Sequence, residues 1–218
     1  GGGGGAGVGR SAPLLRAQPR RLRMLPHRAP SGLGRGTRVD LAERLRIDTA
    51  PSLERGSVIH AWCERIEWLD DALPGGGLPE AETLRRDAKR IAPRMPTGEV
   101  DELIARFREW TARTEVRATL RREAYPAEAR LERELPFLHR SGDTILEGII
   151  DRLVVWDDGA EVIDFKSDVV DPGDEAGLEQ LVGIYAPQLE AYRGAVAGIF
   201  GLPGDALRAK LVFLRAGA

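Results

Sequence analysis

The part of this sequence that most constrains the fold lies between residues 144 and 166. Residues 144–156 (TILEGIIDRLVVW) are rich in β-branched and other apolar side chains, Asp157-Asp158-Gly159 is typical of a tight turn, and residues 160–166 (AEVIDFK) continue the β-rich pattern. We therefore predict a β-hairpin. With the turn at Asp157-Asp158, Asp151 and Asp164 are equally far from it along the two strands, so they lie opposite each other.

The sequence before this hairpin predicts helices. Apolar residues recur at helical spacing in residues 54–73. A second helix is expected at residues 80–91, and a third from an N-cap at Thr97 to about residue 121. The hairpin is therefore preceded by three helices.

Strands and one more helix complete the pattern. Residues 129–138 alternate between apolar and polar side chains as a strand does, and residues 208–215 form a final apolar strand. A helix is expected from near Gly183 to about Phe200, with Pro187 tolerated only in its first turn. The order α-α-α-β-β-β-α-β predicts a single mixed α/β domain.

The first part of the chain differs in composition from the rest. Residues 1–50 are rich in Gly, Pro, Arg and Ala and have no sustained apolar period, so we expect a flexible tail or linker there and the folded domain at residues 51–218. Residues 1–38 contain eight arginines and no acidic residue. These arginines are either simply solvated or part of an arm that contacts the DNA backbone.

Overall composition excludes several classes of protein. With 42% hydrophobic and 30% charged residues, the chain is typical of a globular protein. The one cysteine, Cys63, excludes an internal disulfide framework and any site with several cysteine ligands, and it favours a cytoplasmic setting. No apolar run approaches the roughly 18 residues that span a membrane. The chain begins with GGGGG rather than Met, which suggests a fragment or a processed product.

Two opposed carboxylates in an apolar hairpin have a chemical consequence. They repel each other, and a cation between them removes the conflict. Oxygen ligands favour Mg²⁺ or Mn²⁺, and Lys166 follows Asp164 by two residues on the same face of the strand. This arrangement suits phosphodiester hydrolysis, with the metal activating water and offsetting charge on the phosphate. The spacing alone is equally compatible with an Asp–Lys ion pair at a sheet edge.

Five short stretches occur together in one order and cover about residues 53–215. Their sequences are RGSVIH, ERELPF, EGIID, VIDFKSD and YAPQLEAY, at residues 55–60, 132–137, 147–151, 162–168 and 185–192. In these stretches the chain resembles the PD-(D/E)xK nuclease superfamily and, more narrowly, the C-terminal nuclease domain of RecB/AddA-type helicase–nucleases. The resemblance implies a restriction-endonuclease-like fold, a mixed sheet flanked by helices with an N-terminal helical segment.

The resemblance also implies a metal centre. Asp151 and Asp164 would be carboxylate ligands, the backbone carbonyl of Phe165 would complete the metal shell, and Lys166 would orient or activate the attacking water. His60 would be a further ligand or a group beside the metal. A structural role is the alternative for His60, because it lies at the border of an apolar helix face.

Residues on the last helix are expected to support this centre. Gln188 and Tyr192 are one helical turn apart, with Tyr185 on the same face, and would line the DNA strand or brace the active site. They would otherwise form a packed polar pair. Asp168 is expected to cap the loop that follows, and Glu134 is expected to be structural.

The expected function is an Mg²⁺- or Mn²⁺-dependent DNA nuclease, an exonuclease or end-processing enzyme in double-strand-break repair. The iron–sulfur subgroup of the family is excluded by the lone Cys63. No G-x-x-x-x-G-K-[ST] phosphate loop is present, so unwinding would require a helicase domain in the same longer polypeptide or a partner protein. One alternative is a catalytically inactive DNA-binding or scaffold module of the same fold, and another is a standalone nuclease.

Overall fold

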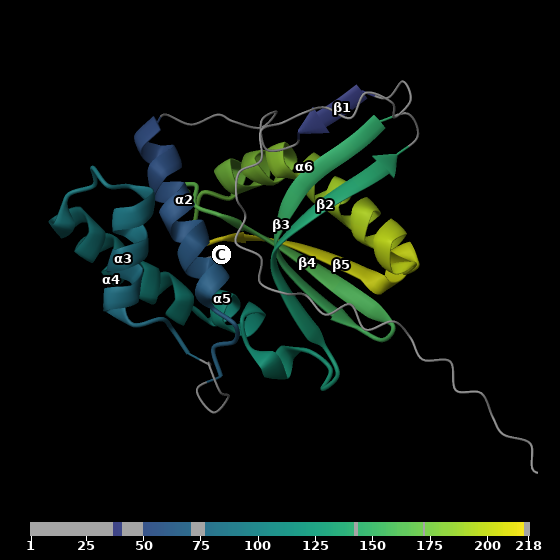
Figure 1. The fold of residues 1–218 in the computed structure, drawn as a ribbon, viewed down its shortest axis with the longest axis horizontal. Helices are drawn as coiled ribbons and strands as arrows, with labels where there is room; N and C mark the ends of the chain where they lie inside the picture. Colours follow the sequence, from purple (N-terminus) through teal and green to yellow (C-terminus); the bar gives the residue numbers. More distant parts are fainter. Residues whose placement is uncertain (1–36, 41–49, 71–76, 142–143, 172, 216–218) are drawn as a thin grey trace, which may run out of the picture. The chain divides into compact units, whose positions relative to one another are not determined.

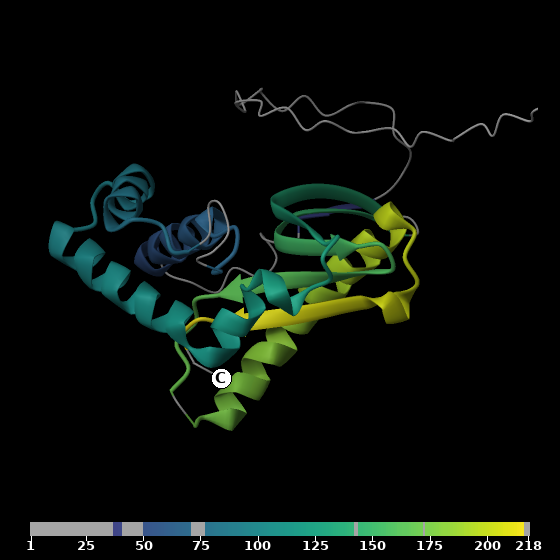
Figure 2. The same ribbon diagram turned by 90° about the horizontal axis from the view of Figure 1, so that it is seen from below.

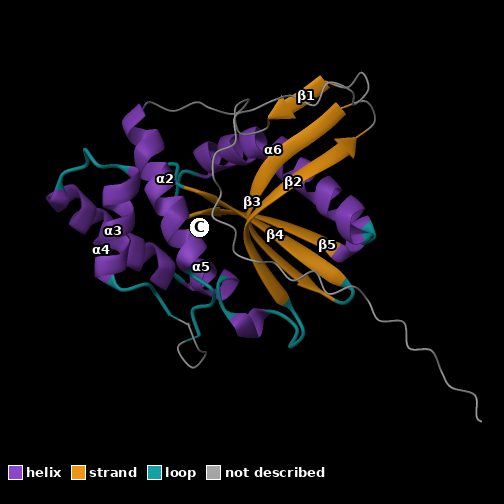
Figure 3. Cartoon of the chain, viewed as in Figure 1, coloured by secondary structure: helices purple, strands orange, loops and turns teal. Residues whose placement is uncertain are grey.

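The computed structural model describes residues 37–40, 50–70, 77–141, 144–171 and 173–215. Five strands form one mixed sheet, and helices cover it (Figures 1 and 3). The strands are β1 (Thr37–Asp40), β2 (Arg130–Ser141), β3 (Thr144–Trp156), β4 (Gly159–Lys166) and β5 (Leu207–Phe213). The α-helices are α2 (Ala50–Arg65), α3 (Ala81–Ile91), α4 (Thr97–Ala112), α5 (Thr114–Thr119) and α6 (Glu175–Phe200).

Strand β3 is the centre of the sheet because three strands pair with it. β2 runs antiparallel along almost its whole length on one edge. On the other edge, β1 pairs in parallel with residues 144–147 and β4 pairs antiparallel with residues 152–156. β5 then pairs in parallel with β4, after the crossover through α6. The edge of β3 therefore changes partner partway along the strand.

The two faces of the sheet pack against different helices. Val154 and Ile163 belong to an apolar cluster with residues of α2, α3, α4 and α5. Their neighbours Leu153 and Val162 belong to a second cluster with residues of α6. This is the alternation that a strand with two buried faces requires. Figure 2 shows α6 running along the sheet while the other helices gather at one end of it.

The predicted hairpin is confirmed. β3 and β4 are joined by a turn at Asp157-Asp158, and their ladder runs from Trp156↔Gly159 to Arg152↔Ile163 with every pair equally far from the turn. The mixed α/β fold class expected from the sequence is also confirmed, and the sheet flanked by helices is consistent with a restriction-endonuclease-like fold.

The prediction for the last helix was wrong at its start. α6 begins at Glu175, so Pro187 lies in the helix interior rather than in its first turn. The side chain of Asp174 accepts a hydrogen bond from the amide of Gly177 at 3.0 Å and caps the earlier start. The helix continues past Pro187 because both halves bury side chains: Leu181 packs beside the cluster formed by Val170 and Phe213, and the second half carries buried residues.

The predicted helix at residues 54–73 was wrong at its end, because α2 stops at Arg65. The buried guanidinium of Arg152 donates hydrogen bonds to the carbonyls of Ile66 and Glu67, at 2.8 and 2.6 Å. The amide of Leu69 donates to Leu120 instead of continuing the helix. Contacts from distant parts of the chain therefore override the helical apolar spacing of this segment.

The third predicted helix is divided in two. Thr97 is the first residue of α4 rather than its N-cap, a position that Pro96 occupies. Arg113 is extended between α4 and α5, and its Nη1 donates to the carbonyl of Leu214 at 3.1 Å. The interruption thus lets Arg113 reach the end of β5.

One strand lies within the segment predicted to be a flexible tail. Residues 37–40 form β1 and continue the sheet, while the rest of that prediction, at residues 1–36 and 41–49, lies outside the described residues. Among the helices that the structure describes, none is both long and apolar enough to cross a membrane.

Candidate active site

The candidate site lies where the edge of β3 changes partner. Between the segment paired with β1 and the segment paired with β4, residues 148–151 have no ladder partner on that edge within the described part of the sheet. Asp151 is the last residue of this gap. Its Oδ2 accepts a hydrogen bond from the amide of Phe165 at 2.8 Å. The Asp151 side chain therefore holds the end of β4 at the point where the main-chain ladder stops.

Asp164 lies on β4 at the position that corresponds to Asp151 on β3. The ladder ends one pair before Asp151 and Asp164, so the two residues hold the predicted equivalent positions without being main-chain partners. Asp164 is 2% exposed. Its Oδ2 forms an ion pair with Nζ of Lys166 at 2.7 Å and has no other polar partner among the described residues.

The two carboxylates differ in acidity. Burial alone would raise the pKa of Asp151, but the neighbouring His60 and the amide of Phe165 lower it below its ordinary value. Burial and the charge of Asp151 raise the pKa of Asp164 to about 6, and Lys166 only partly opposes them. Asp151 is therefore the carboxylate held ionised, while Asp164 is the one that an added cation would stabilise most.

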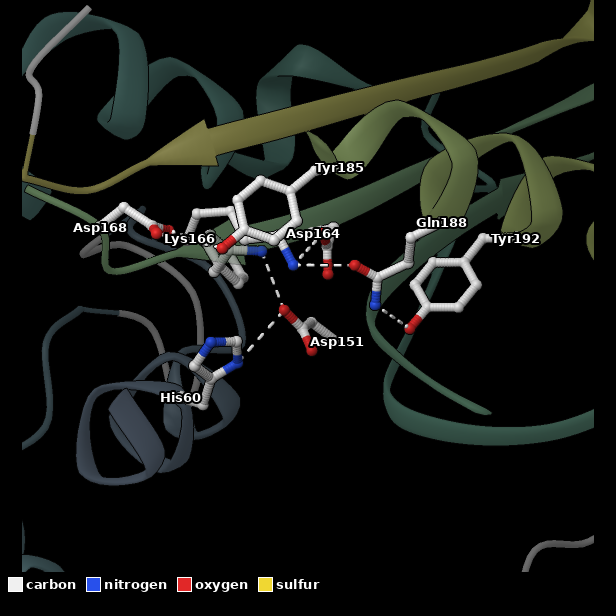
Figure 4. A network of polar contacts seen from close by, with 9 residues as sticks. His60, Asp151, Asp164, Lys166, Asp168, Tyr185, Gln188 and Tyr192 are labelled. Atoms are coloured by element: carbon white, nitrogen blue, oxygen red, sulfur yellow. Dashed lines mark hydrogen bonds and ion pairs between the residues drawn. The ribbon is translucent and has the colours of Figure 1, made fainter. Parts of the chain in front are cut away.

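Lys166 is fixed from several sides, as Figure 4 shows. Besides Asp164, its Nζ donates to Oε1 of Gln188 at 3.0 Å and lies 4.1 Å from the ring centroid of Tyr185. Gln188 in turn donates to the hydroxyl of Tyr192 at 2.7 Å. The three residues predicted on the last helix thus meet the lysine directly or through one another.

The sequence did not indicate the contact between Tyr185 and Asp168. The Tyr185 hydroxyl donates to the two carboxylate oxygens of Asp168, at 3.0 and 3.1 Å (Figure 4). The expected role of Asp168 is a cap on the following loop, and the structure instead places its side chain against α6. The contact holds the Tyr185 ring beneath Lys166, and no local spacing predicts it because the partners are on different elements.

His60 reaches the site from α2. Its Nδ1 lies 3.3 Å from Oδ2 of Asp151, the oxygen that also accepts from the Phe165 amide. Burial lowers the pKa of His60, but Asp151 more than offsets this effect and the pKa lies above its ordinary value. His60 is thus in contact with Asp151.

One pocket brings these groups together. It has a volume of about 460 Å³ and contains six of the predicted site residues in its lining: His60, Asp151, Asp164, Lys166, Gln188 and Tyr192. Tyr185 lies beside Lys166 and outside this lining, and the Phe165 side chain is buried in the core. Phe137 and Ile149 give the pocket an apolar side.

Glu134 is a neighbour of the site that the sequence did not reveal. The β2–β3 ladder pairs the residues on either side of it, so Glu134 lies opposite Asp151, yet its φ of 49° is left-handed. Burial, with the charges of Asp151 and Glu64, raises its pKa to about 7. The regular alternation of residues 129–138 carried no sign of this backbone.

The donor atoms fit a divalent cation in part. The buried carboxylate of Asp164 and the largely buried one of Asp151 supply oxygen donors of the kind that Mg²⁺ or Mn²⁺ prefers. However, the described residues contain no group of three or more His, Cys, Asp or Glu arranged to hold a metal ion. The metal shell of His60, Asp151, Asp164 and the Phe165 carbonyl therefore stays a prediction, for which the structure offers the neighbouring Asp151 and Asp164 and the contact of His60 with Asp151.

Comparison with known proteins identifies the superfamily to which the chain belongs. A family model described as the PD-(D/E)XK nuclease superfamily matches residues 33–217, so the chain belongs to that superfamily. Nucleases of this superfamily generally use divalent metal ions.

A curated relative narrows the comparison. The chain is similar to the AddA-type subunit of an ATP-dependent helicase/nuclease from Desulforamulus reducens, with 36% identity over 88 residues. The match covers 34% of this chain and 7% of the relative, so the chain spans a small part of that protein's length. The resemblance to AddA-type proteins drawn from the sequence is confirmed.

Proposed function

We propose that this chain is a metal-dependent deoxyribonuclease that hydrolyses phosphodiester bonds. The observation that carries the proposal is the common pocket of Asp151, Asp164 and Lys166, at the point where β3 changes partner. Membership of a nuclease superfamily supports it. Mg²⁺ or Mn²⁺ is the proposed ion, because the donors are chiefly carboxylate oxygens.

The roles proposed for the metal-holding residues follow from their contacts. Asp151 and Asp164 would hold the ion with the backbone carbonyl of Phe165, and His60 would be a further ligand or would orient Asp151. The bound ion would supply positive charge to the phosphate and lower the pKa of a water molecule.

Lys166 would act on the water or the phosphate. Its Nζ is held between Asp164 and Gln188, and the Tyr185 ring covers it. A cation fixed in this way is already in place for the negative charge that develops on the phosphate, which is the arrangement that lowers a barrier most. Gln188 and Tyr192 would keep the ammonium group in position.

The test is cleavage of end-labelled linear and circular DNA in Mg²⁺, Mn²⁺ or EDTA. Lys166→Ala should reduce cleavage on the order of 10²-fold or more while the protein stays folded. Lys89→Ala is the matched control, because Lys89 is an exposed lysine on α3. Near-normal cleavage by folded Lys166→Ala would refute the role, and cleavage of circular DNA would show endonuclease activity.

The wider role is part of the same proposal. The name of the relative, which describes an ATP-dependent helicase/nuclease, supports a chain that works with a helicase in the same longer polypeptide or in a partner protein. We propose end processing or exonuclease action in double-strand-break repair, in the cytoplasm. Faster degradation of linear duplex DNA when the helicase and ATP are added is the expected result.

The second candidate is an inactive DNA-binding or scaffold module of the same fold. The observation that favours it is that the described residues contain no group of three or more His, Cys, Asp or Glu arranged to hold a metal ion. Tight binding of DNA without cleavage in either metal would establish this alternative.

A further inference from the structure

A second pocket shares two walls with the candidate active site. On α2, Ile59 lines the second pocket while the next residue, His60, lines the first. After β4, Ser167 lines the second pocket while Lys166 lines the first. The second pocket has a volume of about 370 Å³ and extends to α4. The two pockets therefore adjoin each other along α2 and at the end of β4.

Three arginines from three parts of the fold line this second pocket: Arg55 of α2, Arg106 of α4 and Arg215 after β5. Arg55 is paired with Glu99, at 2.6 Å from Nε to Oε1. Within the described ranges, neither Arg106 nor Arg215 forms an ion pair. Two guanidinium groups are thus left without a carboxylate at one pocket.

Three acidic residues of the described chain also line this pocket, and none of them forms an ion pair with Arg106 or Arg215. Glu99 is taken by Arg55, and Asp168 accepts from the hydroxyl of Tyr185. Glu102 also lines the pocket, one helical turn before Arg106, but no ion pair between the two is found among the described residues. The pocket's formal charges therefore balance, but among the described residues Arg106 and Arg215 have no carboxylate within ion-pair distance, so their guanidinium donors can still contact a ligand.

Arg215 is held in place rather than extended into solvent. Its guanidinium carbon lies 5.9 Å from the ring centroid of Trp110, and its Nη1 is 3.5 Å from the carbonyl of Ser167. Burial and the charges of Arg106 and Arg55 lower the pKa of Arg215, and the charge of Asp168 only partly opposes them. Like charges brought together in this way are stabilised by an anion, and guanidinium groups suit phosphate because they can donate two parallel hydrogen bonds.

We propose that this pocket binds a phosphate of the DNA strand whose scissile phosphate lies in the catalytic pocket, with Arg106 and Arg215 as the contacting groups. The inference rests on the proposed function for its choice of ligand. It adds a substrate subsite that fixes the strand on one side of the cleavage position. The phosphate is either internal to the strand or the terminal phosphate of a DNA end, and the two share the same chemistry.

The test is DNA binding by the full chain, measured by fluorescence anisotropy in the Lys166→Ala background with EDTA. Arg106→Gln should weaken binding of a single-stranded oligonucleotide on the order of ten-fold, and the slope of log K against log salt should fall by about 1. Arg106 is exposed, so the change does not threaten the fold. Arg108→Gln, at an exposed arginine two residues further along α4, is the matched control and should change affinity less than about two-fold.

Chemically altered DNA locates the phosphate. A neutral methylphosphonate at the contacted position should weaken binding to the Arg106-intact protein, and weaken binding to Arg106→Gln less, because only Arg215 then still contacts that phosphate. Oligonucleotides with and without a terminal phosphate separate the two sources of the phosphate. If affinity depends on the terminal phosphate, the pocket binds a DNA end. If affinity depends on an internal phosphate, the pocket binds the strand away from its end.

The outcomes separate this inference from the proposed nuclease activity. Equal affinities for Arg106→Gln and Arg108→Gln, or no measurable DNA binding, would overturn the subsite. If the unmutated chain cleaves DNA and Arg106→Gln cleaves with an unchanged KM, the subsite fails while the nuclease stands. If the unmutated chain never cleaves DNA but its DNA binding depends on Arg106, the proposed nuclease activity fails while the subsite stands.

Discussion

Nζ of Lys166 donates a hydrogen bond to Oε1 of Gln188 at 3.0 Å, and this bond links the end of β4 to the middle of α6. The amide of Gln188 has its orientation set by Tyr192, whose hydroxyl accepts from Nε2. Only the carbonyl end of the amide can then face the lysine, so Gln188 positions Lys166 in a defined direction.

We predict that Gln188→Ala lowers DNA cleavage about ten-fold, because Lys166 loses the acceptor that balances its attraction to Asp164. Some stability should also be lost, about 1 kcal/mol, because Gln188 is buried and its amide donates to the Tyr192 hydroxyl. Cleavage rates and thermal unfolding of the variant measure the two effects. Gln180→Ala, at an exposed glutamine on the same helix, is the control. Equal rates for both variants would remove the positioning role.

The contact between His60 and Asp151 predicts a pH effect on metal binding. A protonated His60 competes with a cation for Oδ2 of Asp151, and its pKa lies above the ordinary value of about 6.5. Affinity for Mn²⁺ should therefore fall as the pH drops through that pKa. Calorimetric titration of Mn²⁺ and Mg²⁺ at several pH values measures this.

His60→Ala should impair cleavage and lose more affinity for Mn²⁺ than for Mg²⁺ if the imidazole is itself a ligand. An equal loss for both ions would indicate that His60 acts only by orienting Asp151. Unchanged dependence on both metals would make His60 structural and leave Asp151, Asp164 and Lys166 as the site.

The pair of Arg65 and Asp87 predicts a dependence of stability on pH. Arg65 donates two hydrogen bonds to the buried Asp87, one of them at 2.7 Å, and holds its pKa below the ordinary value. The lowered pKa means that the stabilisation is present above about pH 4 and is lost as the pH falls through the folded-state pKa. Asp87→Asn should therefore lower the free energy of unfolding by about 1–2 kcal/mol at pH 7, a difference that narrows below about pH 4.

Urea unfolding at about pH 7 and about pH 3, on either side of the ordinary carboxyl pKa, checks this difference. Asp101→Asn is the control, because Asp101 pairs with Arg85 in an exposed position and should change stability far less than Asp87→Asn does. A penalty for Asp87→Asn that stays constant across both pH values would contradict the assignment.

Two glycines near the site predict opposite effects on stability. A Cβ at Gly148 would lie 3.0 Å from Phe137 and 3.4 Å from Tyr192, two buried rings that already pack edge to face. Gly148→Ala should therefore cost about 1–2 kcal/mol and reduce cleavage, because Tyr192 supports Gln188. Gly194 lies within α6 with open space at its Cβ, so Gly194→Ala should stabilise by about 0.5–1 kcal/mol. Thermal unfolding of both variants measures these changes in stability. A Gly148→Ala variant as stable as Gly194→Ala would contradict the prediction.

The hairpin could be predicted from the sequence because its information is local. The turn at Asp157-Asp158 and the apolar strands beside it determine the register within one short stretch. The interior position of Pro187 could not be predicted, because burial on both sides of it outweighs the local cost of proline. The contact of Tyr185 with Asp168 and the left-handed backbone of Glu134 depend on strands and helices meeting in space, which spacing along the chain does not record.

The change of partner along β3 also bears on the order in which the chain folds. The β3–β4 hairpin closes through a two-residue turn and brings Asp151 and Asp164 into register from neighbouring sequence alone. The parallel pairing of β4 with β5 and the contact of Lys166 with Gln188 wait for the whole of α6, because both lie across that crossover. We therefore expect the carboxylates to come into register early in folding, and the lysine beside them to be set in place only when the long-range half of the sheet has closed.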